Sequence, residues 1–247
     1  MGFLKITGIV IKNINTGESD KVVTLLTDTN GRVQAYARSS RRAGGNLAAS
    51  CQFLCYSEFV LFEGRNMYSI NSASIIEPFY EIGQDIVRLT YAAHMCELIS
   101  DIVQEEQPSL EIMRLFLNTL HIMAKTNRAP ALINEIFELK LLELAGFTPY
   151  PGNCSACGKE LSEKACFIER ECGLVCHECG IRTGEGSALS IGTLRALTHI
   201  SGDGASGLFS FEVSGTVLKE LETISDAFLR QYMEKQYKRL DILKTLR

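Results

Sequence analysis

The chain has 247 residues, of which 46% are hydrophobic, and its formal net charge at pH 7 is −4. This apolar content is enough for packed cores and excludes an intrinsically disordered chain. No apolar run reaches the length of about 18 residues that a membrane span needs, and the first residues lack the basic and apolar regions of a signal peptide. We therefore expect a cytoplasmic protein with no membrane partner.

Residues 3–76 show the composition and alternation of β-strands. The five expected strands are Leu4–Ile14, Val22–Thr27, Arg32–Arg38, Phe53–Phe62 and Met67–Ile76. The turn signal Asp28–Gly31 separates the second strand from the third, and the long loop Ser39–Asn46 follows the third. Five short strands with one long connection are typical of a small closed barrel such as an OB-fold, with an SH3-like barrel as the alternative.

After Pro78 the apolar residues follow the helical period. The expected helices are Ile82–Val103, Leu110–Ala124, a helix from Pro130 that stops at Gly146 as its C′ residue, a short helix through Leu197 that Ser190 caps, and Val217–Leu246. The predicted fold is therefore α+β and multi-domain. It has an OB-fold domain at 1–80, a helical domain at 81–150, a zinc-binding loop module at 151–187, and C-terminal helices at 188–247 that pack on the helical domain.

Two Cys-x-x-Cys-Gly segments carry the strongest chemical signal in the chain. They contribute Cys154, Cys157, Cys176 and Cys179. A pair of C-x2-C segments at this separation predicts one tetrahedral Zn²⁺ site, and four protein ligands make such a site structural rather than catalytic. The glycine after each pair is expected to turn the chain back with a positive φ.

The other cysteines of the nine do not suggest disulfides. Cys51, Cys55 and Cys96 lie in apolar segments, where reduced buried thiols are expected. Cys166 and Cys172 lie between the two pairs and are possible substitute ligands.

Positive charge is concentrated near the N-terminus. Residues 1–50 hold seven basic and three acidic residues, a balance of 7 − 3 = +4, whereas residues 81–150 hold five basic and ten acidic residues, or −5. Arg38, Arg41 and Arg42 lie in a Ser/Gly-rich loop at the expected barrel rim. Arginine forks match phosphate oxygens, so this loop is a candidate DNA contact, with a merely solvated loop as the alternative. Tyr36, Tyr56 and Tyr68 are candidates for base stacking.

Catalytic motifs are missing from the sequence. It has no G-x-x-x-x-G-K-[ST] loop, no H-E-x-x-H, no G-x-S-x-G and no zinc-deaminase pattern. His94 and His121 lie in apolar helical stretches, and His177 lies inside the second cysteine pair, so none is a clear catalytic base. We expect no enzymatic activity. The alternatives are an enzyme with a structural zinc ribbon and an unrecognised active site, or an adaptor that binds no nucleic acid.

Two segments resemble a known family. These are Gly8–Ile11 with Gly17–Thr27, Gly31 and the arginine loop, and Phe137–Pro149 running into the first cysteine pair. Together they resemble the recombination mediator family RecO. The resemblance implies an OB-fold, a helical body and a zinc module, in a bacterial protein that acts on the nucleoid without catalysis.

The resemblance also implies partners. RecO-like proteins bind single- and double-stranded DNA, anneal complementary strands and, with RecR, help RecA to displace single-strand-binding protein. Carried over by position, the arginine-loop residues Arg38, Arg41 and Arg42 would contact DNA. Lys21 and Arg32, in the same basic N-terminal part of the chain, are also predicted to bind DNA. The loop holds two adjacent arginines and no lysine, so it is less basic than is common in the family.

The resemblance further implies docking of the acidic, hydrophobic-ended C-terminal tail of single-strand-binding protein, and such a tail needs cations beside an apolar groove. We expect this site on the helical body, with basic residues from 190–247. The candidates are Arg195, Lys219, Arg230, Lys235, Lys238 and Arg239, near Leu197, Phe228 and Tyr232.

Overall fold

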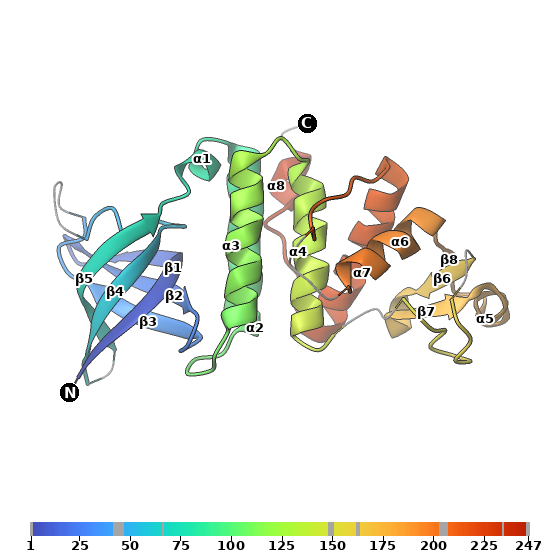
Figure 1. Cartoon of the computed structure of the whole chain (residues 1–247), viewed down its shortest axis with the longest axis horizontal. Helices are drawn as coiled ribbons and strands as arrows, with labels where there is room; N and C mark the ends of the chain where they lie inside the picture. Colours follow the sequence, from blue (N-terminus) through green and yellow to red (C-terminus); the bar gives the residue numbers. More distant parts are fainter. Residues whose placement is uncertain are drawn as a thin grey trace. The chain divides into compact units, whose positions relative to one another are not determined.

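The structure, a computed structural model, describes residues 2–41, 47–65, 67–147, 151–161, 164–202, 207–233 and 235–245. The chain forms two compact units, residues 1–126 with 239–247 and residues 127–238 (Figure 1). The finer division at residues 80, 150 and 187 stays a prediction.

Five strands of the first unit form a closed barrel (Figure 1). They are β1 (Phe3–Thr16), β2 (Asp20–Thr27), β3 (Arg32–Ala37), β4 (Tyr56–Glu63) and β5 (Tyr68–Glu77). Their order is β1-β2-β3-β5-β4, with a parallel pairing between β3 and β5 and antiparallel pairings elsewhere. This arrangement confirms the predicted OB-fold.

The long strand β1 contains an irregularity that interrupts its alternation. Its first half pairs with β4 and its second half with β2, and the register shifts between Val10 and Lys12. A bulge adds a residue and bends the strand, so that Val10 and Ile11 are both buried. The fourth strand begins later than predicted, because Leu54 has a φ of 64° and belongs to a turn.

The barrel core consists of alternate residues from all five strands. It contains Ile6, Val10, Val23, Leu25, Val33, Ala35, Phe59, Leu61 and Ile70. The opposite faces of β2, β3 and β5 stay accessible to solvent in part.

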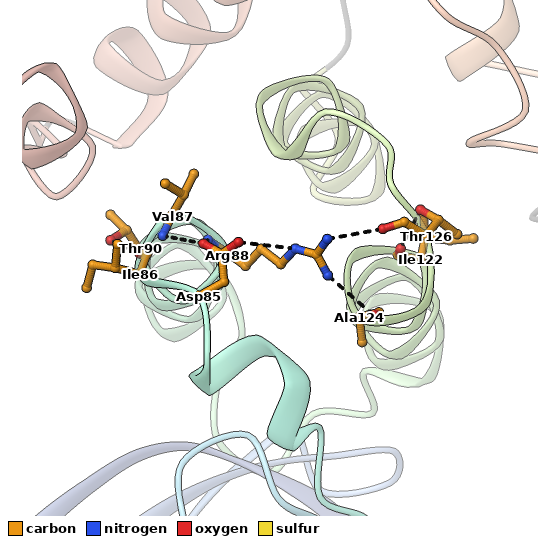
Figure 2. A network of polar contacts seen from close by, with 8 residues as sticks. All are labelled: Asp85, Ile86, Val87, Arg88, Thr90, Ile122, Ala124 and Thr126. Carbon is orange, nitrogen blue, oxygen red and sulfur yellow. Dashed lines mark hydrogen bonds and ion pairs between the residues drawn. The ribbon is translucent and has the colours of Figure 1, made fainter. Parts of the chain in front are cut away.

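The helices of the first unit are α1 (Tyr80–Gly83), α2 (Ile86–Ile102), α3 (Leu110–Lys125) and α8 (Asp241–Lys244). The predicted helix from Ile82 is interrupted at Asp85, whose carboxylate accepts from the N–H groups of Val87 and Arg88 and so caps α2. Figure 2 shows Arg88 reaching from α2 to the end of α3, where its guanidinium donates to the carbonyls of Ala124 (3.4 Å) and Thr126 (3.3 Å). These bonds satisfy carbonyls that a helix end leaves without partners.

The β2–β3 turn is fastened to the loop between α2 and α3. Arg32 N donates to Gln104 O (3.1 Å), and Glu106 N donates to Asn30 O (3.0 Å). Gly31 lies between these bonds with a φ of 60°, and a Cβ placed there would come within 2.2 Å of Gln104 O and 2.5 Å of Gln107 O. The glycine is therefore required by both its backbone conformation and the close approach.

The second unit joins a helical body to a small sheet. Its helices are α4 (Pro130–Leu144), α5 (His177–Thr183), α6 (Ile191–Ile200) and α7 (Gly215–Met233); its strands are β6 (Ala165–Ile168), β7 (Gly173–Cys176) and β8 (Ser187–Ala188); and a 3-10 turn spans Glu169–Glu171. The α6 and α7 helices pack on α4. Two predicted signals are confirmed: Gly146 follows α4 with a φ of 89°, and the Ser190 hydroxyl accepts from Thr193 N at the start of α6.

The predicted helix Val217–Leu246 is wrong in its second half, because α7 ends at Met233. Residues 239–247 belong to the first unit, where Arg239 pairs with Glu97 at 3.2 Å. None of the helices in the described part of the chain has the length and hydropathy of a membrane span.

Candidate functional site

The turn between β1 and β2 holds the base of the arginine loop. The Asp20 carboxylate accepts a hydrogen bond from the Tyr36 hydroxyl (2.7 Å) and another from Ser39 N (2.7 Å). Ser39 has a φ of 52°, a conformation that costs energy for a residue with a side chain. The two bonds to Asp20 keep the chain in this conformation where it leaves β3.

Arg41 is bound to the same turn. Its backbone N donates to Ser19 O (2.9 Å), and its guanidinium donates to Gly17 O (3.3 Å). The segments 17–20 and 36–41 therefore form one structural element, which we call the loop clamp. Because these bonds hold the backbone, they place the exposed arginines at a defined position beside the barrel.

The loop clamp affects the titration of its own members. The Tyr36 hydroxyl, and then Ser39 N, donate to Asp20 and lower the pKa of its carboxyl below the usual value, although partial burial opposes this. In return, the bond to Asp20 raises the pKa of Tyr36. Asp20 is therefore ionised at neutral pH, and its carboxylate is hydrogen-bonded within the loop clamp.

The predicted basic residues fall into two groups. Arg38 and Arg41 are exposed, and Arg42 lies outside the described residues. Lys21 is only 9% exposed. Arg32 donates to the carbonyl of Ser100 and lies 3.7 Å from Glu105. The geometry favours Arg38 and Arg41 as contacts, and the role of all five in DNA binding stays a prediction.

The three predicted stacking residues are all partly buried. Tyr36 is held by Asp20, and Tyr68 packs against the barrel core. The role of Asp20 was not predicted from the sequence, because its partners Tyr36 and Ser39 lie 16 and 19 residues away along the chain.

The four predicted zinc ligands form a single cluster. The sulfurs of Cys154, Cys157, Cys176 and Cys179 all lie within 4.8 Å of one another and could hold a metal ion. Cys154 and Cys179 are buried, whereas Cys157 is exposed.

The first cysteine pair is shaped by a tight turn. Gly158 N donates to Cys154 O (2.8 Å), and Cys154 N donates to Lys159 O (2.7 Å). Gly158 has a φ of 72°, which confirms the predicted turn.

The second pair is built differently. Cys176 precedes the first residue of α5, Cys179 lies in the first turn, and Gly180 is helical. The predicted positive φ at Gly180 is therefore wrong. Gly180 is needed because a Cβ there would lie 2.8 Å from the Cys166 sulfur.

The pKa values of two thiols in the cluster are shifted in opposite directions. Burial raises the pKa of Cys154, but the N–H groups of Cys176, Ala156 and Cys157 outweigh it and lower the pKa to about 6. Burial and the neighbouring sulfurs raise the pKa of Cys179 to about 12. A metal cation bound by the cluster would favour the ionised form of Cys154 and Cys179.

The remaining cysteines and histidines lie outside this cluster. All nine cysteines are free thiols, which fits the expected reduced state. Cys172 donates to Gln231 Oε1 (3.1 Å), and Cys166 packs against Gly180. His94 is buried, whereas His121 and His177 are exposed.

The expected peptide site on the helical body needs correction. Leu197 and Phe228 are 1% and 2% exposed, so they belong to the core and cannot line a groove. Arg230 is paired with Glu169 at 2.6 Å. A hollow of about 510 Å³ lies instead beside α6; it is lined by Pro151, Leu161, Ile191, Leu194, Arg195, Thr198 and His199.

Comparison with known proteins agrees with this architecture. The family profile "Recombination protein O N terminal" matches residues 1–79, and "Recombination protein O C terminal" matches residues 83–241. A protein named DNA repair protein RecO from Acetivibrio thermocellus is 42% identical over 246 residues, which cover 100% of this chain and 98% of that protein. Proteins of the same name from Caldicellulosiruptor saccharolyticus and Symbiobacterium thermophilum are 33% and 32% identical, and each match covers 100% of this chain and at least 99% of the relative. The barrel, the helical body and the four-cysteine cluster therefore belong to a member of the RecO family of DNA repair proteins.

Proposed function

We propose that this protein is a non-enzymatic recombination mediator that binds single- and double-stranded DNA and anneals complementary strands. Together with RecR, it would help RecA to replace single-strand-binding protein on DNA. Such a protein works on the nucleoid, in the bacterial cytoplasm. The proposal rests on family membership and on one structural observation, the loop clamp.

The loop clamp supports DNA binding because it organises cations in advance. Bonds to Ser19 and Gly17 hold Arg41, so little conformational freedom remains to be lost when a phosphate binds. Arginine at such a site offers a planar fork that matches phosphate oxygens. Contacts of this kind position DNA without reading its sequence.

Annealing by this mechanism requires no nucleotide hydrolysis. A cationic surface that holds two strands lowers their mutual repulsion and raises their local concentration. The sequence contains no phosphate-binding loop of the P-loop type, in agreement with a reaction that needs no nucleotide.

We propose that the thiolate cluster binds one structural Zn²⁺. Zinc at about 2.3 Å from each of four sulfurs would separate neighbouring sulfurs by about 3.8 Å. Cys157 Sγ and Cys176 Sγ lie 3.8 Å apart. Lys159 pairs with Glu178 at 2.8 Å and Arg182 donates to the Cys179 sulfur at 3.5 Å, so positive charge is near the dianionic centre that four thiolates and Zn²⁺ would form.

The hollow beside α6 is our proposed site for the tail of single-strand-binding protein. Leu194 and Ile191 offer apolar walls, and the exposed Arg195 at the rim suits an acidic peptide. The test is binding of a tail peptide to Arg195→Glu, which should be lost while oligonucleotide binding is retained. If the peptide still binds, it docks elsewhere.

The central experiment is a salt titration of oligonucleotide binding, with wild type and Arg41→Ala/Arg42→Ala. The double variant should bind all sequences more weakly, and its salt slope should fall by roughly one for each phosphate that is no longer neutralised by an arginine. Annealing of labelled strands should be accelerated without ATP and slowed by salt. A wild type that binds no oligonucleotide at low salt would favour the adaptor alternative, and a strict need for ATP would favour an enzyme.

A further inference from the structure

A continuous row of paired residues runs around the outer wall of the barrel. The strand register places each member beside the next, in the order Phe3, Phe62, Ser69, Tyr36, Val22 and Ile14. We call these six residues the outer row. It begins on β1, crosses β4, β5, β3 and β2, and returns to β1.

The outer row faces solvent. Directly paired residues on neighbouring strands point to the same face of a sheet, and sequence neighbours point to the other. The neighbours Leu61, Ala35 and Val23 are all 0% exposed and belong to the barrel core. By contrast, Phe3 is 67% exposed and Phe62 is 36% exposed.

The row presents aromatic faces that the barrel core does not use. Phe3 and Phe62 contact each other edge to face, with ring centroids 5.5 Å apart. Tyr36 lies two positions further along the row, beyond the small Ser69, and its hydroxyl is fixed by Asp20. Exposed apolar side chains that gather in this way commonly mark a binding surface.

Exposed cations border the row. Arg38 follows Tyr36 by two residues and lies just beyond the end of β3, Lys12 precedes Ile14 by two residues on β1, and Arg65 lies in the turn after Phe62. None of these three forms an ion pair with the described residues. The nearby acids are partly neutralised, because Glu58 pairs with Lys5 at 3.0 Å and Asp20 accepts its bonds in the loop clamp; Glu63 remains exposed.

We infer that unpaired DNA bases stack on the aromatic part of the outer row, on Phe3, Phe62 and Tyr36. This inference rests on the proposed DNA-binding function and specifies its ligand as single-stranded DNA with accessible bases. The bordering cations face the phosphates. Base stacking on aromatic side chains tolerates any sequence, which suits a protein that must accept any chromosomal strand.

The dimensions fit a short stretch of single strand. Three strand spacings separate Phe3 from Tyr36, about 14 Å in all. A stacked strand rises about 3.4 Å per base, so this distance holds about four bases. Such a length agrees with the smallest sites known for barrels of this type, about four nucleotides.

A tryptophan reporter tests the inference directly. The chain contains no tryptophan, so Phe3→Trp in the full-length protein introduces a single tryptophan, whose emission can be excited selectively over that of the tyrosines. Titration with oligo(dT) should quench it, whereas an abasic oligonucleotide of equal length should not. Ile76→Trp is the matched control, because Ile76 is 53% exposed on the same barrel but lies outside the row; its emission should stay unchanged.

Affinity provides the second test. Phe3→Ala/Phe62→Ala should weaken oligo(dT) binding by roughly tenfold or more, and abasic binding and the salt slope should stay unchanged, because every cation that faces a phosphate is still present. Phe62→Tyr keeps an aromatic ring at this position, so it should retain base stacking and the oligo(dT) affinity of the wild type. If wild type binds oligo(dT) but the double variant binds it equally well, or loses abasic binding to the same extent, the inference is overturned. If wild type binds no oligonucleotide at all, the proposed function itself fails.

Discussion

Replacing Gly31 with alanine should destabilise the first unit much more than the same change at Gly17. Both glycines have a positive φ, 60° and 54°. They differ in space, because a Cβ at Gly17 meets nothing within 4 Å, whereas a Cβ at Gly31 would lie 2.2 and 2.5 Å from two carbonyl oxygens. The pair therefore separates the cost of backbone conformation from the cost of crowding.

The expected magnitudes follow from these distances. A left-handed conformation costs alanine about 1–2 kcal/mol at either position. At Gly31 the crowding must also be relieved, which would disrupt the bonds from Arg32 N to Gln104 O and from Glu106 N to Asn30 O. Each backbone hydrogen bond contributes about 1 kcal/mol net. We therefore expect a loss of about 3–4 kcal/mol for Gly31→Ala and about 1–2 kcal/mol for Gly17→Ala.

The assay must report on the first unit alone. Hydrogen exchange measured by mass spectrometry can do so, because peptides from residues 20–37 and 103–110 report on the junction and peptides from 165–180 report on the other unit. Gly31→Ala should lower protection in the first two segments and leave the third unchanged. Equal losses in the two variants would refute the reasoning, since crowding at Gly31 would then have no cost.

Three further predictions concern the cysteine cluster, the loop clamp and a buried carboxyl. Cys154→Ser should lose the bound metal and melt at a lower temperature, whereas Cys166→Ser, a buried cysteine outside the cluster, should keep one metal per chain by elemental analysis. Asp20→Ala should weaken oligonucleotide binding because it frees the loop, although removal of the negative charge alone would strengthen it. Burial, and then Glu138, raise the pKa of Glu135 well above its usual value. The folded state therefore resists ionisation while the unfolded chain ionises above about pH 4.5, so Glu135→Gln should raise the melting temperature at pH 8 and change it little below pH 4.

Each of these three predictions can be contradicted by one result. A metal-free wild type that is fully folded would contradict a structural ion. Tighter binding by Asp20→Ala in filter or anisotropy assays would show that charge outweighs the clamp. An unchanged melting temperature for Glu135→Gln at pH 8 would show that the carboxyl ionises freely in the folded state.

The barrel could be predicted from the sequence because the alternation of apolar and polar residues along a strand is a local pattern that does not depend on distant contacts. The alternation of buried and exposed positions along the strands also bears on the predicted DNA contacts, but the prediction did not take it into account. Lys21 has the same parity on β2 as Val23 and Leu25, both 0% exposed, so its burial was readable from the sequence. Arg32 has the parity of the exposed Gln34 on β3, and only the positions of the C-terminal end of α2 and of the loop after it explain why it contacts Ser100 and Glu105.

Contacts between segments that are distant in the sequence were the main features that could not be predicted from it. The loop clamp joins residues 17–20 to residues 36–41, and no local pattern gives Asp20 a structural role. Likewise, no proline or glycine between residues 233 and 240 marks the end of α7. Residues 239–247 belong to the first unit, and this division is also not marked by a local sequence pattern.

The acidic net charge is compatible with DNA binding because charge is sorted along the chain. Residues 1–50 carry +4, so the remaining residues carry −4 − 4 = −8. Under the proposed function, DNA would be attracted to residues 1–50 and repelled chiefly by residues 81–150, which carry −5. This would orient the encounter and suppress binding elsewhere. Removing Arg38 and Arg41 would leave +2 on residues 1–50 within a chain of −6. The decrease in affinity should then exceed the contribution of two phosphate contacts, because the attraction that guides DNA to the outer row would be weakened as well.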